Sequence, residues 1–185
     1  MGFNDASFDV HDKSNSHSCS IISLGTGSLE GSSRVQREVA AASTAEAELI
    51  AMASGTKKLI SSLMAYREMT GRKKEKALLL EDNTAAMKLA ENGRSMSSAS
   101  RHIRRRYFTS HQYLKKDFVL KHCPTLSMVA DLGTKPLQGA MFERLRDQVL
   151  GVTRLEDDPE LKGALEFVKN QGVALGAPGA LDIKL

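Results

Sequence analysis

The sequence of 185 residues contains no tryptophan, only two cysteines and only four prolines. Two cysteines, Cys19 and Cys123, do not provide the disulfide framework of a small secreted protein. No run of apolar residues is long enough to span a membrane, and the polar N-terminus does not resemble a signal peptide. Taken as reduced thiols, the cysteines predict an intracellular protein, and the choice between cytoplasm and nucleus stays open.

Length and composition fit one domain with an extension. The hydrophobic content of 41% is enough to form a core. The net charge of +4 and the pI near 9.1 lean mildly towards an anionic partner such as nucleic acid. Most basic proteins of this modest charge bind no nucleic acid, so the total alone does not decide function.

The first 33 residues predict a β-meander. A strand over residues 1–7, with Asp5 near its end, is followed by the polar, turn-prone string DVHDKSNSHS and by an apolar strand over residues 20–24. Gly25 and Gly27 offer turn positions before a third strand near residues 28–33. Only four residues precede Asp5, so we expect the first strand to be cut short.

The strongest helix prediction covers residues 43–71. Ser43 and Glu46 form an S-x-x-E capping box, and Gly71 is suited to the C-terminal end. Because Glu46 can reach back to the cap, it has a structural role, whereas Glu48 lies beside the apolar face without one. Glu48 is therefore favoured over Glu46 as a ligand. The apolar face comprises Leu49, Met52, Ala53, Ile60, Leu63 and Met64.

The middle of the chain predicts a strand that delivers acidic residues to its carboxyl end. The apolar strand over residues 77–80 ends in Glu81, Asp82 and Asn83, directly before a short helix over residues 84–90. This arrangement is typical of sites in α/β proteins. A loop and a basic helix over residues 102–116 follow, then a strand over residues 117–123. The basic helix is expected to carry Ile103, Tyr107 and Leu114 inward.

Two more helices are predicted before a change in composition. They cover residues 127–134 and 139–150, the second with Phe142, Leu145 and Val149 on one side. We predict one domain over residues 1–152. Residues 153–185 are predicted as an extension, acidic at first and then Gly/Ala-rich and partly mobile. We expect it to hold one short helix that begins near Asp158 or Pro159.

Four acidic residues could meet at one point of such a fold: Asp5, Glu48, Asp82 and Asp131. They come from a strand, a helix, a second strand and a late helix. Four hard oxygen ligands suit a pair of Mg²⁺ ions, and two such ions suit in-line attack on a phosphodiester. The constellation therefore indicates a nuclease, although each acid taken alone is more often simply solvated.

The motifs around these acids resemble the ribonuclease H domain at the C-terminal end of the Pol polyprotein of Ty1/copia-type retrotransposons. The resemblance runs from about Phe3 to Val152 and rests on four strings in the family order. These are STAEAELIA, EDNTAAMKLAENGRS, RHIRRRYF and CPTLSMVADLGTKPLQGAMFERLRDQVLGV.

The resemblance implies an α/β fold of the RNase H-like kind, a mixed five-stranded sheet with three antiparallel strands first, flanked by helices. It implies that Asp5, Glu48, Asp82 and Asp131 are catalytic and hold two Mg²⁺ or Mn²⁺ ions. The reaction implied is cleavage of the RNA strand of an RNA–DNA hybrid, leaving 5′-phosphate and 3′-hydroxyl ends. In that family the domain works downstream of a reverse transcriptase domain, the partner implied for a parent polyprotein.

Some positions depart from the family pattern. Cys19 stands where the family usually has glycine, Gly133 where it has a large apolar residue, and Arg104 where it has aspartate. A glycine inside a helix costs about 1 kcal/mol relative to alanine, so Gly133 is expected to weaken the segment around Asp131. These departures predict a divergent or decaying copy, yet none removes a proposed metal ligand.

Contacts to nucleic acid are predicted for polar residues near the second strand motif and the basic helix. They are Asn83, Thr84, Ser97, Ser98, Arg101, Arg104 and Lys115. A solvated helix face explains the basic string equally well. Two functions stay open: an active endoribonuclease acting on RNA–DNA hybrids, and a catalytically inactive RNase H-like module that binds nucleic acid or serves as a scaffold in a larger assembly.

Overall fold

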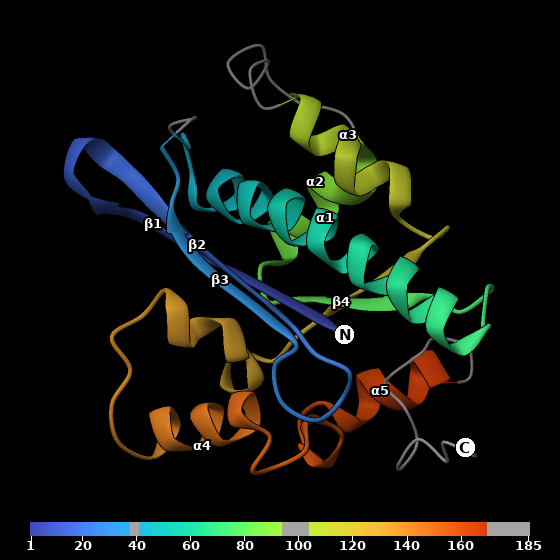
Figure 1. The fold of residues 1–185 in the computed structure, drawn as a ribbon. Coiled ribbons are helices and arrows are strands. Elements are labelled where there is room, and N and C mark those ends of the chain that lie inside the picture. Colours follow the sequence, from blue (N-terminus) through green and yellow to red (C-terminus); the bar gives the residue numbers. More distant parts are fainter. Residues whose placement is uncertain (38–40, 94–103, 170–185) are drawn as a thin grey trace.

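One five-stranded sheet separates two layers of helices in the computed structural model, which describes residues 1–37, 41–93 and 104–169 (Figure 1). The strand order is β3-β2-β1-β4-β5; β1 to β3 are antiparallel, and β4 is parallel to β1 and β5. The expected mixed sheet with three antiparallel strands first is confirmed. The strands are β1 (Gly2–His11), β2 (Asn15–Ile22), β3 (Glu30–Val35), β4 (Ala77–Glu81) and β5 (Phe118–His122).

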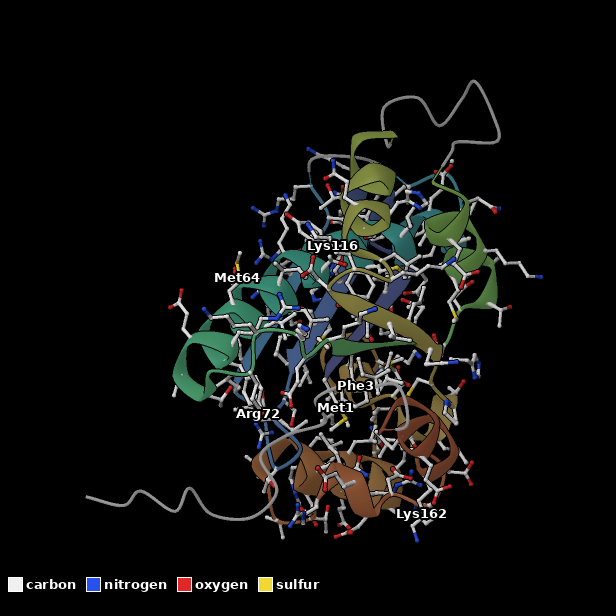
Figure 2. The ribbon with its side chains drawn as sticks, turned by 90° about the vertical axis from the view of Figure 1, so that its right-hand side faces the viewer. Met1, Phe3, Met64, Arg72, Lys116 and Lys162 are labelled. Carbon is white, nitrogen blue, oxygen red and sulfur yellow. The ribbon has the colours of Figure 1, made fainter. Side chains whose placement is uncertain are left out.

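Helices cover both faces of this sheet. One face carries α1 (Thr44–Thr70), α2 (Thr84–Asn92) and α3 (Arg104–Tyr113), and the other carries α4 (Gly139–Leu150) and α5 (Lys162–Lys169) (Figure 1). Strand β4 is buried on both faces, which is why it reads as an unbroken apolar run. Figure 2 shows Met1 and Phe3 beside the layer of C-terminal helices, in agreement with the core cluster that they share. No described helix is both long and apolar enough to cross a membrane.

The helix predicted over residues 43–71 is confirmed as α1. The hydroxyl of Ser43 accepts a hydrogen bond from the backbone N–H of Glu46, at 3.3 Å. The carboxylate of Glu46 in turn accepts one from the backbone N–H of Ala42, at 2.8 Å. Gly71 ends the helix in the left-handed conformation, with φ of 71°. Glu46 is therefore occupied by the helix start, as its sequence position predicts.

Several local predictions are wrong. Strand β1 continues to His11, so Asp5 lies inside it and not near its end. Residues 127–134 do not form one helix; they lie in two short 3₁₀ helices, η3 (Thr125–Ser127) and η4 (Val129–Gly133). In α4 the side chain of Phe142 is 39% exposed, while Met141 packs against the core with Leu145 and Val149.

The packed core does not stop at Val152. Leu155, Leu161 and Leu165 are buried in the same cluster as Phe3. The carboxylate of Asp158 accepts hydrogen bonds from Arg144 at 3.0 Å and from Gln148 at 2.7 Å. The acidic part of the expected extension therefore belongs to the domain, and its helix, α5, begins at Lys162. The Gly/Ala-rich end, residues 170–185, lies outside the described residues.

Candidate active site

The site forms where two parallel strands stop pairing. Strands β1 and β4 are paired only at Gly2 with Leu79 and at Phe3 with Leu80. Beyond these pairs β4 ends at Glu81, whereas β1 continues along its antiparallel partner β2. Asp5 and Asp82 each lie two residues after the last pair, on the two separating chains. Helix α1 crosses the same face and supplies Glu48 from its first turns.

Three of the four predicted acids meet at this point. Asp5, Glu48 and Asp82 each place one carboxylate oxygen within 4.8 Å of the other two. Asp5 is 1% and Glu48 3% exposed, and Asp82 is half-buried. Within the described ranges, no second group of three or more His, Cys, Asp or Glu side chains meets the same condition. The convergence expected of these three carboxylates is therefore present.

The fourth acid, Asp131, reaches the site through η4. The Ser7 hydroxyl donates to the carbonyl of Thr134 and the Ser33 hydroxyl to the carbonyl of Gly133, both at 2.7 Å. The hydroxyl of Thr134 donates to the carboxylate of Asp5. These bonds hold η4 against β1 and β3, so that Asp131, 2% exposed, comes to lie beside Asp5.

Lys135 forms ion pairs with two of the acids, and the sequence motifs did not predict it as a site residue. Its ammonium lies 2.7 Å from a carboxylate oxygen of Asp131 and 3.4 Å from one of Asp5. The spacing of four residues from Asp131 is the signal that could have found it, because residues four apart approach each other along a helix. In the metal-free protein Lys135 neutralises part of the charge of both carboxylates.

Glu81 is a further buried acid at this site. It is 0% exposed; one of its oxygens accepts a hydrogen bond from the backbone N–H of Asn83 at 3.1 Å, and the other has no partner among the described residues. Successive residues of a strand point to opposite faces, so its position beside Asp82 offers no reason to expect it near Glu48. It adds a further titratable group to the site without an evident ligand role.

Burial and mutual repulsion keep part of this cluster protonated. Burial raises the pKa of Glu48 to about 10, and the charges of Glu81, Asp5 and Asp82 act in the same direction. Burial likewise raises the pKa of Glu81 well above its usual range. The pKa of Asp131 rises to about 6, because burial outweighs the hydrogen bond from Lys135. A bound cation would relieve the repulsion and favour the ionised forms.

The residues fit a hard divalent cation. All of the converging groups are carboxylates, and one buried oxygen of Glu48 has no hydrogen-bond partner within the described part of the chain. Mg²⁺ holds oxygens at about 2.0–2.1 Å, so ligands on opposite sides of one ion are about 4 Å apart. The observed spread of 4.8 Å therefore requires only small movements of side chains.

The raised pKa values predict that the metal-free protein loses stability as pH rises. An acid whose pKa is raised by folding binds its proton more tightly in the native state, so its contribution is largest below its ordinary pKa and is lost as pH rises through the raised value. For Glu48 this window extends from 4.5 to about 10. We expect the free energy of unfolding in urea with EDTA to fall between about pH 5 and 8.

Glu81→Gln tests the cause of that loss. It removes a carboxyl group that is ionised in the unfolded chain at pH 8 and must take up a proton or bury its charge on folding, while keeping the shape of the side chain. We therefore expect it to raise the free energy of unfolding at pH 8 by about 1–3 kcal/mol. At pH 5 the difference should be small, because this pH is close to the ordinary pKa of 4.5 and folding then costs little in proton uptake. Glu91→Gln, at an exposed position of α2, is the matched control. The same pH slope in both variants would contradict the assignment.

Gly133 allows η4 to approach β2 and β3 closely. A Cβ atom added at Gly133 would lie 2.5 Å from Sγ of Cys19 and 3.1 Å from Cβ of Ser33. Cys19 is 4% exposed, so its thiol fills the space that a side chain at position 133 would take. The two departures from the family pattern thus match each other. Gly133 is the last residue of η4 and does not lie inside a longer helix, so its expected mid-helix placement is wrong; its effect on stability stays a prediction.

Gly133→Leu is therefore expected to destabilise the protein by at least about 2 kcal/mol through overpacking. Adding Cys19→Gly should recover most of that loss, because it empties the space beside position 133. Urea unfolding of the wild type, the two single variants and the double variant measures the coupling. Purely additive losses would show that the two positions do not share this space.

The residues predicted to contact nucleic acid do not all lie near the acidic site. Asn83 caps α2 by accepting from the backbone N–H groups of Ala85 and Ala86, both at 3.0 Å, and Thr84 is exposed beside it. Lys115 lies at the opposite end of β4 from the acids, since its carbonyl accepts from Lys76 just before that strand. Arg104 begins α3, but its side chain is outside the described part. Ser97, Ser98 and Arg101 lie outside the described residues.

Comparison with known proteins finds structural similarity but no matching sequence family. No family model matches the sequence. The chain is similar to the crystal structure of RNase H1 from the halophilic archaeon Halobacterium salinarum NRC-1, with 14% sequence identity and a TM-score of 0.46. The similarity covers 70% of this chain and 88% of that chain.

Proposed function

We propose that the chain is a metal-dependent endoribonuclease that cleaves the RNA strand of RNA–DNA hybrids. The observation that carries the proposal is the convergence of Asp5, Glu48 and Asp82 within 4.8 Å at a buried point, with Asp131 beside them. A carboxylate set of this kind suits divalent cations and phosphodiester chemistry. The substrate class comes from the resemblance of the motifs.

The four acids are proposed as the ligands of two Mg²⁺ or Mn²⁺ ions. Such ions, when bound, activate a water molecule and stabilise the leaving oxygen. The chain's own groups hold the ligands in place: Thr134 and Lys135 bind Asp5, and the hydroxyl of Thr125 donates to Asp82 at 3.4 Å. Glu48 is carried by a helix whose start is fixed by its capping box. Ligands on supported elements of this kind keep the geometry that catalysis requires.

The origin of the domain is a finer proposal. On the resemblance of the motifs alone, we propose that it derives from the Pol polyprotein of a Ty1/copia-type retrotransposon. A reverse transcriptase domain would then be its natural partner. Purification of the parent polyprotein, followed by analysis of its processing products, would test this origin.

A strand-resolved cleavage assay tests the function. The pure chain is incubated with an RNA–DNA hybrid labelled on either strand, with Mg²⁺, with Mn²⁺ or with EDTA. We expect cleavage of the RNA strand alone, only with added metal, and none by Asp82→Asn. Equal background cleavage by the wild type and Asp82→Asn would refute the enzyme and favour the catalytically inactive module.

A further inference from the structure

A second polar site lies on the outer side of α1. It is a pocket of about 460 Å³ between the end of β3, the outer side of α1 and α3. Lys57, which lines it, follows Glu48 by about two and a half turns at 3.6 residues per turn, and therefore projects from the opposite side of the helix. Met64, two turns further on, is seen on that outer side in Figure 2. The pocket is thus separate from the acid cluster.

The lining of this pocket is strongly cationic. Arg34, Arg37 and Lys57 contribute three positive charges, and none of its described lining residues is acidic. Arg37 and Lys57 are exposed and have no ion pair with any described residue. By contrast, Arg144 is paired with the buried carboxylate of Asp158 at 3.0 Å. Three residues with hydroxyl groups also line the pocket, Ser18, Ser54 and Thr109, and the other lining residues are Val35, Gln36, Ile50 and Ala53.

A buried glutamine fixes the two elements that carry these cations. Gln36 is 6% exposed, and its side-chain amide donates to the hydroxyl of Ser18 at 2.6 Å and to the carbonyl of Ala47 at 2.9 Å. The end of β3, with its two arginines, is thereby held against the start of α1. Cations carried on elements held in this way lose less entropy when they bind a ligand.

We propose that this pocket binds a phosphate group of a nucleic-acid strand. Arginine, lysine and hydroxyl side chains are the usual donors to backbone phosphates. The volume lies within the range of about 300–1,000 Å³ that is common for ligand sites. The described lining contains no aromatic ring on which a base could stack, which favours a strand held by its backbone over a free mononucleotide. The inference does not depend on the proposed hydrolysis, because binding is measurable without metal.

Charge neutralisation with a matched control tests the pocket. Arg37→Gln/Lys57→Gln removes two pocket cations, and Lys73→Gln/Lys74→Gln removes two exposed cations before β4. Binding of a fluorescent RNA–DNA hybrid is measured by anisotropy in EDTA over a salt series. We expect the pocket variant to lose about tenfold in affinity and its salt slope to fall by roughly 1–2, at about 0.9 per phosphate contact. The control should change by less than about twofold. Equal losses in both double variants would overturn the site, because net charge alone would explain them.

Competition experiments distinguish a nucleic-acid strand from a small phosphate compound as the ligand of the pocket. Inorganic phosphate, a mononucleotide and an unlabelled hybrid are each added to the labelled complex. We expect the hybrid to compete at far lower concentration than either small phosphate. Stronger competition by the mononucleotide would overturn a strand as the occupant. If the chain binds the hybrid through the pocket but never cleaves it, the proposed function is refuted and the phosphate site stands. If the chain cleaves the hybrid and the pocket variant binds as tightly as the wild type, the phosphate site is refuted and the proposed function stands.

Discussion

Glu48→Gln is expected to lower the rate of hybrid cleavage by about 100- to 1,000-fold, the loss typical of removing a group that stabilises charge in a transition state. Glu48 is 3% exposed, lies within the 4.8 Å cluster and has one oxygen without a partner among the described residues. Glutamine keeps the shape but cannot supply a charged ligand. Single-turnover cleavage, with enzyme in excess and saturating Mg²⁺, measures the loss.

Glu46→Gln is the matched control on the same helix. Glu46 serves the start of α1, and glutamine can serve the same capping role, so we expect near-normal activity. Glu46→Ala removes the cap and should cost about 1 kcal/mol of stability while the folded protein stays active. Activity that survives Glu48→Gln and is lost with Glu46→Gln would exchange the roles of the two residues.

The start of α1 shows what sequence can predict well. Capping is a local interaction between residues three apart, so Ser43, Glu46 and Gly71 are enough to place the helix and to set Glu46 aside. The meeting of Asp5, Glu48 and Asp82 needed more. It depended on a family resemblance, because no local rule relates residues separated by 43 and 34 positions.

The polar end of β1 could not be predicted as a strand from hydrophobic patterning. Its last residues are exposed, and they pair with β2 up to His11 and Asn15 in a two-stranded ribbon. With little apolar surface to bury, DVHDKSNSHS reads as a turn. The acidic segment after Val152 shows the opposite error, a packed segment that was predicted to lie outside the domain. Its average composition suggested an extension, whereas three of its leucines complete the core, Leu155, Leu161 and Leu165.

Contacts between distant elements were the hardest to foresee. Lys135 and Glu81 became part of the site only when η4 and β4 were placed beside β1. The fit of Gly133 to Cys19 likewise joins residues more than a hundred positions apart. Gly133 alone predicted only a weakness, because its partner Cys19 is set by tertiary packing.

Gly55 of α1 lies directly against the side chain of Asn4, so Gly55→Ala is expected to have a large effect on stability. A Cβ atom at position 55 of α1 would lie 1.7 Å from Oδ1 and 2.6 Å from Cγ of Asn4. Asn4 is 0% exposed, so its side chain cannot turn out into solvent to avoid the clash. We expect the substitution to lower the free energy of unfolding by about 2–4 kcal/mol through overpacking, although alanine favours a helix by about 1 kcal/mol.

Asn4→Ala should reverse the sign of that effect. The three atoms nearest to the added Cβ all belong to Asn4, so its removal clears the space completely. In the Asn4→Ala background, Gly55→Ala should therefore be neutral or stabilising by up to about 1 kcal/mol. Urea unfolding of all four proteins gives the coupling energy. An equal loss in both backgrounds would show that the strain of Gly55→Ala arises elsewhere.

The same four proteins also test the site. Asn4 directly precedes Asp5 on β1, and Gly55 is on the helix that carries Glu48. Movement of β1 away from α1 would separate two of the proposed ligands. Hybrid cleavage should therefore fall in folded Gly55→Ala and return in the double variant. Recovery of stability without recovery of cleavage would mean that the fit of α1 against β1 supports the core but does not set the distance between Asp5 and Glu48.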